Sequence, residues 1–352
     1  MQLRTETTDT RTRRCSMFLL GVSLFLSQHI PAHEISPFFP IPLQEEQEGF
    51  KSPQPMWQEC TLLFVGDLMQ HGPQIKRAQR PDGTFLYDSC FADVKEHIQA
   101  ADYAIGNLEV TLGGEPYKGY PCFSAPDAWL DALKRTGFDI VTTSNNHCLD
   151  RGRYGLERTL LMTDSLGMLA IGTYRDDADR TRRYPLIIEK NGIRIALLTY
   201  TYGMNGFTVS EPNIVNTIDT VMMKKDLEQT YSQHPDVVIA IMHWGTEYRL
   251  TPDSYQLFYA RWLLNHGVDH IIGGHPHVIE PTEWRPRTDI PDSHLIVWSQ
   301  GNFISNMSAP HTFDGTMLTL TLRKTGFVTR IAHTESHTVR TTRPDYRLKI
   351  IN

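Results

Sequence analysis

The chain has 352 residues, of which 40% are hydrophobic and 21% are charged. This composition supports a packed globular core and argues against wholesale disorder. The 34 Lys and Arg residues against 40 Asp and Glu residues give a formal net charge of −6, so a general nucleic-acid-binding surface is not expected. The mean hydropathy of −0.34 excludes a multi-span membrane protein.

The N-terminus has the pattern of a targeting segment. Arg11, Arg13 and Arg14 precede an apolar run over 17–26, and Ala32 follows as a cleavage position. The run is much shorter than the ~20 apolar residues that a spanning helix needs. Residues 1–32 are therefore predicted to be a signal peptide or, alternatively, an N-terminal membrane anchor. Either outcome places the protein at the periplasmic or extracellular face of a membrane.

Residues 33–58 are rich in Pro, Gln and Glu without periodicity, which predicts a semi-extended linker. Removal of 1–32 leaves 30 basic and 38 acidic residues, a charge of −8, and four of the five cysteines. Five cysteines are too few for a disulfide scaffold, although one or two disulfides are compatible with export. We expect one folded domain over 59–340 and a C-terminal tail over 341–352.

Short apolar runs alternate with amphipathic stretches from Cys60 onward, which predicts an α/β architecture. Continuous Val, Ile and Leu runs predict strands that are covered on both faces, at 60–65, 102–106, 138–143, 194–200, 236–242, 268–272 and 294–299. Helices are expected at 126–136, 153–166, 219–233 and 252–266, the last of them capped by Thr251. Alternating residues predict a C-terminal β-hairpin over 315–323 and 327–335.

Polar side chains follow these strands where each strand ends. They are Asp67, Asn107 and Glu109, then Asn146, His147 and Asp150, then His243, Trp244 and Glu247, then His275 and His277, and finally Asn302. Ligands of open α/β sheets bind beyond the carboxyl ends of the strands. Each cluster alone has an ordinary structural explanation, but together they predict a metal or catalytic site. Imidazole with carboxylate and amide oxygens suits Zn, Mn or Fe.

These motifs, in this order, resemble the CapA family of capsule-synthesis proteins, named for a part in poly-γ-glutamate production. The resemblance covers about residues 60–305 and rests on Gly66-Asp67-x-Met69, Asn107-Leu108-Glu109, Asn145-Asn146-His147, His243-Trp244-Gly245-x-Glu247, Gly274-His275-x-His277 and Gly301-Asn302-Phe303. The family looks like a branch of the calcineurin-like metallophosphoesterases. It implies two facing β-sheets flanked by helices, a four-layer sandwich, with one or two divalent metals at the strand ends.

The resemblance also implies roles for single residues. Asp67, Asn146, His243, His275 and His277 take metal-ligand positions, and His147 takes the position that assists the leaving group. Glu109 is our candidate for the carboxylate that bridges two metals. The histidine usual two places after Asp67 is missing, so this position has fewer ligands unless His71 folds back into it. We therefore expect the protein to hold nearer one metal than two.

Two functions are consistent with this resemblance. The first is a metal-dependent hydrolase acting on a phosphoester or amide of a surface polymer, with His147, Asp150 and Glu247 in catalysis and Asn107, Trp244 and Asn302 in substrate binding. The second is a non-catalytic component that binds an anionic cell-surface polymer or its membrane synthase. A candidate for such a surface is a set of arginines, which are otherwise explained as an ordinary solvated surface: Arg151, Arg153, Arg175, Arg180, Arg182 and Arg183.

Overall fold

The structure, a computed structural model, describes residues 57–288 and 292–351. The predicted targeting segment and nearly all of the predicted linker lie outside the described residues. None of the described helices is long and apolar enough to cross a membrane. The four described cysteines, at 60, 90, 122 and 148, are free thiols, so the structure gives no support to the disulfides that export would allow.

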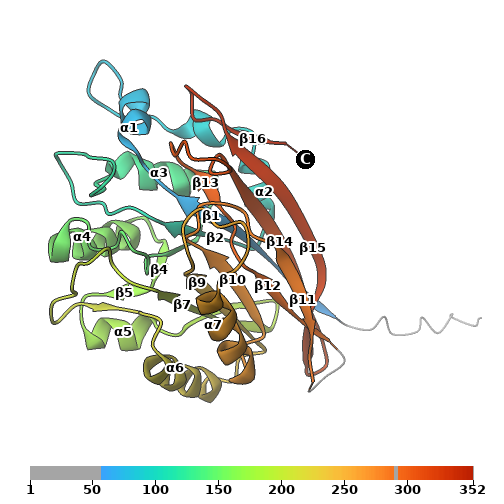
Figure 1. Cartoon of the computed structure of the whole chain (residues 1–352). Helices are drawn as coiled ribbons and strands as arrows, with labels where there is room; N and C mark the ends of the chain where they lie inside the picture. The colour runs from blue at the N-terminus through green and yellow to red at the C-terminus, as the bar shows by residue number, and fades with distance from the viewer. Residues whose placement is uncertain (1–56, 289–291, 352) are drawn as a thin grey trace, which may run out of the picture. The chain divides into compact units, whose positions relative to one another are not determined.

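Most strands belong to two sheets (Figure 1). The first sheet has the order β16 (Leu348–Ile350), β15 (Val328–Thr341), β14 (Asp314–Thr325), β1 (Gln58–Leu68), β2 (Tyr103–Leu108), β3 (Ile140–Thr142) and β4 (Leu169–Ile171), with β13 (Asn302–Ile304) paired to β1. The second sheet has the order β11 (Thr282–Pro286), β12 (Ser293–Val297), β10 (His270–Gly274), β9 (Val237–His243), β7 (Ile193–Thr201) and β6 (Leu186–Lys190). A small third pair joins β5 (Thr173–Tyr174) to β8 (Ile214–Val215).

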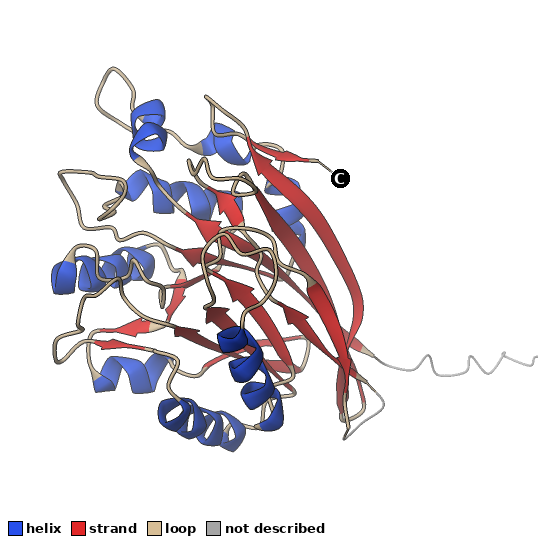
Figure 2. Cartoon of the chain, in the orientation of Figure 1, coloured by secondary structure: helices blue, strands red, loops and turns tan. Residues whose placement is uncertain are grey.

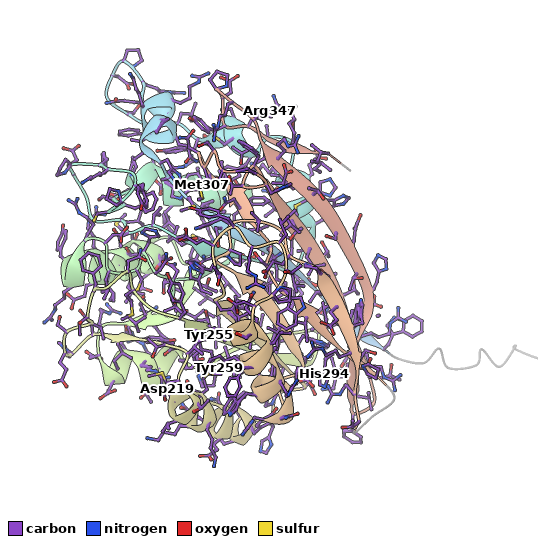
Figure 3. All side chains as sticks on the ribbon, viewed as in Figure 1. Asp219, Tyr255, Tyr259, His294, Met307 and Arg347 are labelled. Carbon is purple, nitrogen blue, oxygen red and sulfur yellow. The ribbon has the colours of Figure 1, made fainter. Side chains whose placement is uncertain are left out.

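The helices pack around the outside of the strands (Figure 2). They are α1 (Gly72–Ala78), α2 (Lys95–Ala100), α3 (Asp127–Thr136), α4 (Gly152–Ser165), α5 (Asp177–Arg183), α6 (Thr220–Ser232) and α7 (Ser254–Asn265), with a 3-10 turn η1 (Asp88–Phe91). Figure 3 labels Asp219, whose carboxylate accepts from the N–H groups of the first turn of α6, and Tyr255 on α7.

Three apolar clusters define the layers. Phe64 and Ile105 of the first sheet share one cluster with Ile195 and Ile239 of the second, so the two sheets face each other. Helices α3 and α4 bury leucines against the other face of the first sheet, and α6 and α7 do the same on the second. This helix–sheet–sheet–helix order is the predicted four-layer sandwich, and the α/β expectation is confirmed.

The structure differs from the sequence analysis at the ends of several elements. Asp253, rather than Thr251, caps α7: its carboxylate accepts from the Gln256 N–H, while the Gln256 side chain accepts from the Asp253 N–H. This reciprocal pair satisfies two N–H groups at once, which a Thr251 cap would not. The C-terminal hairpin is longer than predicted, and β16 adds to it an edge strand from the segment 341–352.

Candidate metal centre

The register of the strands brings the predicted residues together from both sheets. Asp67 at the end of β1 lies opposite Asn107 of β2 and Asn302 of β13. In the second sheet, His243 at the end of β9 lies opposite Gly274 of β10. An ideal Cβ on Gly274 would come within 3.3 Å of Asp67 Oδ1, so the two sheets nearly touch at this point.

The loop after β10 presents its two histidines in an unusual backbone conformation. His275 has a φ of 98° and His277 a φ of 59°, which is the left-handed region that side-chain-bearing residues rarely adopt. Strain of this kind persists where the surrounding structure over-determines it, and it gathers at functional sites. Both rings are only 3% exposed.

Glu109, His243 and His275 form a group whose potential ligand atoms all lie within 4.8 Å of one another. We call this set, together with Asn146, the histidine-rich group. Asn146 Oδ1 lies 2.9 Å from His243 Nε2, and Glu109 Oε1 lies 3.8 Å from the same nitrogen. The group therefore offers two imidazoles, one carboxylate and one amide oxygen.

Asp67, Glu109 and His277 form a second set with the same close spacing, which we call the carboxylate-rich group. His277 Nδ1 lies 3.0 Å from Asn302 Oδ1, while Asn302 Nδ2 donates to the carbonyls of His277 and Thr312. Since the Asn302 amide nitrogen is used in this way, its oxygen accepts from His277 Nδ1–H and leaves Nε2 as the ligand atom. Glu109 Oε1 lies 3.8 Å from this Nε2 and belongs to both groups, as expected of a bridging carboxylate.

Burial sets the protonation of these side chains. It lowers the pKa of His243 to about 3 and that of His275 well below its ordinary value, so both rings are neutral near pH 7. Burial and the neighbouring Asp67 raise the pKa of Glu109 well above its usual range. Burial also opposes charge on Asp67 and His277, but their mutual contact outweighs it, lowering the pKa of Asp67 and raising that of His277.

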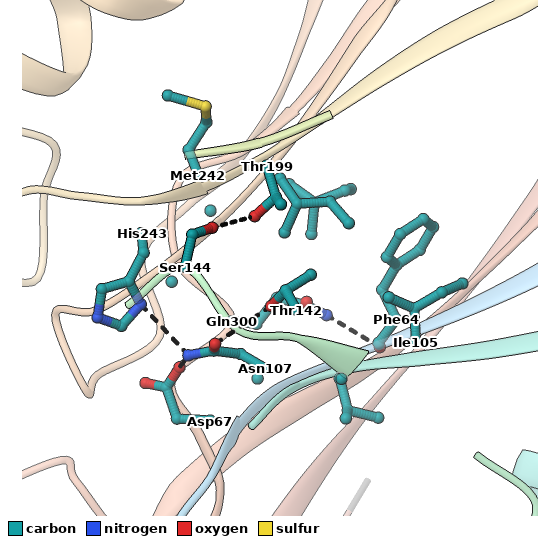
Figure 4. Close-up of a pocket in the computed structure, with 17 residues that line it drawn as sticks. Phe64, Asp67, Ile105, Asn107, Thr142, Ser144, Thr199, Met242, His243 and Gln300 are labelled. Carbon is teal, nitrogen blue, oxygen red and sulfur yellow. Dashed lines mark hydrogen bonds between the residues drawn. The ribbon is translucent and has the colours of Figure 1, made fainter. Parts of the chain in front are cut away.

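Buried atoms without hydrogen-bond partners are a further indication that the two groups fit a divalent cation. Glu109 Oε1 and His275 Nδ1 are buried and have no hydrogen-bond partner, and the buried Asp67 Oδ2 has only an ion-pair contact, at 3.2 Å from His277 Nδ1. Unpartnered buried acceptors are costly, and a cation between them removes that cost. A cavity of ≈ 20 Å³ lies between the sheets, lined by Asp67, Asn107 and His243, with room for about one water molecule (Figure 4).

His147 and Asp150 form a pair beside the two groups. His147 Nδ1 lies 2.7 Å from Asp150 Oδ2, and the same oxygen accepts from the Phe123 N–H at 2.7 Å. Asn205 Nδ2 lies 3.5 Å from His147 Nδ1, and Asn205 Oδ1 accepts from the Asn146 amide. The pair is thus tied to a residue of the histidine-rich group through a single side chain.

The three residues predicted to bind substrate lie beside the centre, but their side chains contact protein groups. Trp244 is fully buried, and its indole N–H donates to the Trp298 carbonyl at 3.1 Å, which leaves no face for a substrate. Asn302 is equally buried and orients His277. Asn107 donates to Asp67 Oδ1 at 2.8 Å and lies 3.3 Å from His243 Nδ1, so it orients two ligands. The burial of Trp244 corrects its predicted role, whereas Asn107 and Asn302 orient candidate ligands and their substrate contacts stay predictions.

The structure also shows how two other predicted residues, Glu247 and His71, lie relative to the centre. Glu247 is exposed and shares a close group with His275 and His277, so it reaches the edge of the centre. His71 belongs to none of the metal-type groups found among the described residues. Its Nδ1 lies 3.2 Å from Gln74 Oε1 and accepts from the Asn306 N–H, so the fold-back that would make it a substitute ligand is not observed.

Sequence reasoning missed two residues that support the centre. Asn145 donates to Asn107 Oδ1 and the Leu108 carbonyl, and accepts from the His147 N–H. Its position beside Asn146 was the available signal. Asn205 lies in a loop far along the chain, and no spacing in the sequence links it to His147.

Solved structures share this fold. A protein named as a 5′-nucleotidase from Staphylococcus aureus matches with a TM-score of 0.50 and 13% identity, over 78% of this chain and 54% of that one. The calcineurin-like phosphoesterase YfkN from Bacillus subtilis matches with a TM-score of 0.44 and 14% identity, over 80% and 91%. At 13% identity the match to the 5′-nucleotidase shows a shared fold alone.

Relatives are found by sequence as well. The PGA biosynthesis protein CapA of Bacillus subtilis (strain 168) is 28% identical over 75% of this chain and 68% of its own length. The capsule biosynthesis protein CapA of Bacillus anthracis is 26% identical over 76% of this chain and 65% of its own. The family described as bacterial capsule synthesis protein PGA_cap matches residues 61–307, which include every predicted site residue. The chain belongs to this capsule-synthesis family, and it shares its fold with the 5′-nucleotidase from Staphylococcus aureus.

Proposed function

We propose that this protein is an exported, metal-dependent hydrolase that acts on a phosphoester or amide bond of a cell-surface polymer during capsule synthesis. The observation that carries the proposal is the pair of unpartnered buried ligand atoms on Glu109 and His275, which lie in close groups with Asp67, His243 and His277. The His147–Asp150 pair beside that set is the second support, because a structural cation site has no need of a neighbouring proton carrier.

The roles follow from the geometry. Asn146, Glu109, His243 and His275 would hold one cation, and Asp67, Glu109 and His277 a second. A divalent Zn, Mn or Fe ion, when bound, polarises a substrate oxygen and lowers the pKa of water. The Asp150 carboxylate holds His147 Nδ1–H, so His147 exchanges a proton with the leaving group at Nε2.

Glu247 lies at the exposed edge of the same centre, where a carboxylate accepts a proton from the attacking water. This role differs from that of the buried carboxylates, which are occupied as ligands.

The proposed partners are an anionic polymer or its membrane synthase. The arginines near 175–183 give little support to direct polyanion binding, because Arg175 and Arg183 pair with Asp179 and Arg180 pairs with Asp226. A negative mature chain would therefore hold a polyanion mainly through the bound cations.

A substrate screen tests the hydrolase. The full chain, loaded in turn with Zn, Mn or Fe, is assayed with p-nitrophenyl phosphate, bis-p-nitrophenyl phosphate and γ-glutamyl-p-nitroanilide. We expect turnover of at least one substrate, lost by about 10²- to 10⁴-fold in His147→Gln and unchanged in His333→Gln, an exposed histidine on β15. Full metal loading with no turnover of any substrate would contradict the hydrolase and favour the binding component.

Fractionation of cells tests export. The protein should be found outside the cytoplasm with a new N-terminus after Ala32, or held at the membrane by its N-terminus. A cytoplasmic protein with Met1 intact would contradict it.

A further inference from the structure

An exposed tyrosine that the roles above do not use lies against the histidine-rich group. Tyr202 directly follows β7, the strand beside β9 in the second sheet (Figure 1). Its N–H donates to the His243 carbonyl at 3.0 Å, and the Thr201 hydroxyl donates to the Gly203 carbonyl at 3.0 Å. The backbone at Tyr202 is therefore held by a candidate ligand residue and by the turn that it begins.

The ring of Tyr202 packs on both imidazoles of the histidine-rich group. Its centroid lies 4.4 Å from that of His275 and 6.4 Å from that of His243, and its plane is within 15° of the His243 ring. The residue is nevertheless 40% exposed. Tyr202 thus contacts candidate ligands and solvent at once, which places it where a substrate enters the centre.

The Tyr202 hydroxyl lies among the polar side chains of the centre. Burial and the carboxylates of Glu247 and Glu109 raise the pKa of Tyr202 to about 12, while a hydrogen bond with the Asn146 side chain lowers it. A partner that lowers the pKa of a phenol donates to its oxygen, so Asn146 supplies an N–H. The proton of the hydroxyl, which an ordinary phenol also keeps at pH 7, remains available to a ligand.

The corresponding tyrosine of the carboxylate-rich group uses its proton within the protein. Tyr248 is exposed, and its ring centroid lies 6.4 Å from that of His277. Burial and a hydrogen bond to the Glu247 carboxylate raise the pKa of Tyr248 to about 12. Its hydroxyl therefore donates to Glu247, and of these two tyrosines Tyr202 is the one with a free donor.

A free neutral donor suits an anionic oxygen at this place. Glu109 and Glu247 are the carboxylates that act on both tyrosines, so a negatively charged substrate group at the centre also meets negative charge. A phenol hydroxyl stabilises an oxyanion by a directed hydrogen bond and needs no charge of its own.

We propose that Tyr202 is a substrate-binding residue whose hydroxyl donates to the negatively charged oxygen of the substrate group held at the histidine-rich group. The inference rests on the proposed function and assigns to that site a residue from the loop after β7.

Calorimetric titration of the Mn-loaded full chain with inorganic phosphate tests the proposal. Phosphate presents tetrahedral anionic oxygens, and its binding is measured without turnover. We expect saturable binding to the wild type, weakened by about tenfold or more in Tyr202→Phe, because a hydrogen bond to a charged group is lost. Tyr154→Phe, at an exposed tyrosine of α4, should bind phosphate as the wild type does. No saturable binding to the wild type, or unchanged affinity in Tyr202→Phe, would overturn the proposal.

Two comparisons separate the hydroxyl from the packing of the ring. Tyr202→Phe keeps the ring on His275, so its metal content after dialysis should equal that of the wild type. Loss of metal in this variant would assign Tyr202 to the support of the ligands and overturn the substrate contact. Tyr248→Phe should weaken phosphate binding less than Tyr202→Phe, and equal losses would overturn the choice of Tyr202.

The hydrolase and this inference can fail separately. A chain that turns over no substrate but loses phosphate affinity in Tyr202→Phe would contradict the hydrolase and support the Tyr202 contact. Turnover by the wild type with unchanged phosphate affinity in Tyr202→Phe would support the hydrolase and overturn the contact.

Discussion

The two halves of the metal centre are built from different donors and are prepared differently for a cation. In the histidine-rich group, burial keeps His243 and His275 neutral near pH 7, so each ring is ready to bind without losing a proton. In the carboxylate-rich group, burial and Asp67 favour a proton on Glu109, which a cation must displace.

The two groups share the Glu109 carboxylate, but they do not offer a cation the same number of ligands. The histidine-rich group offers four ligands, counting Asn146, and the carboxylate-rich group three, because no histidine follows Asp67 at the usual place. We therefore expect one firmly held metal and one that exchanges.

The largest expected effect is the loss of the histidine-rich group. His275→Ala removes one of its two imidazoles, and metal affinity should fall by more than about 100-fold, since even residues that only orient a ligand cost about 10- to 100-fold. Elemental analysis after dialysis measures this loss, with His333→Gln as the matched control. Metal retained at the wild-type level would show that the histidine-rich group does not hold the firmly bound metal.

Asp67→Asn should weaken metal binding at the carboxylate-rich group and leave the histidine-rich group intact. The amide keeps the shape but loses the charge, so binding of a second metal from solution should weaken by about tenfold or more, while the first remains after dialysis. Calorimetric titration of the dialysed protein with Mn or Zn measures the second event. Two tightly held metals in the wild type, or loss of the first metal in Asp67→Asn, would show that the halves are not separate.

The third prediction concerns Gln256 and Glu280, which support the loops that follow β9 and β10. Gln256 packs against Gly245, where an added Cβ would lie 2.6 Å from Gln256 Cδ, and donates to Glu280 Oε2 at 2.6 Å. Burial raises the pKa of Glu280 from 4.5 to about 7. The folded protein therefore holds a proton that the unfolded chain has released, and this contribution to stability is lost as the pH rises from about 4.5 to 7.

Glu280→Gln removes this ionisation and keeps an oxygen for Gln256. Its free energy of unfolding should exceed that of the wild type by on the order of 2 kcal/mol above pH 7 and approach it near pH 4.5. Urea denaturation across this range measures the difference, and Glu96→Gln, an exposed residue of α2, is the control. A constant difference at every pH would exclude Glu280 as its source.

The smallest effect is expected for His71→Ala. His71 contacts Gln74 and Asn306 rather than either group, so metal content should stay within error of the wild type. A loss of metal in this variant would mean that α1 closes onto the carboxylate-rich group in solution.

Much of the centre could be predicted because its residues follow buried strands. Asp67, His243 and His275 each come directly after an apolar run, and the ends of such runs meet at one edge of a sheet. The error at Trp244 was avoidable: neighbouring residues of an extended chain point to opposite sides, so when His243 faces the centre, Trp244 faces the core.

The sequence by itself determined the α/β class and the main strands and helices, because these depend on local patterns of apolar and polar residues, and its motifs supplied the candidate ligand residues. Only the tertiary structure decided that Asn302 orients His277, that Glu109 stands between two groups, and that the loop after β10 adopts positive φ. These features arise where strands from two sheets meet across the core, and contacts between segments so far apart in the chain leave no periodic signal in the sequence.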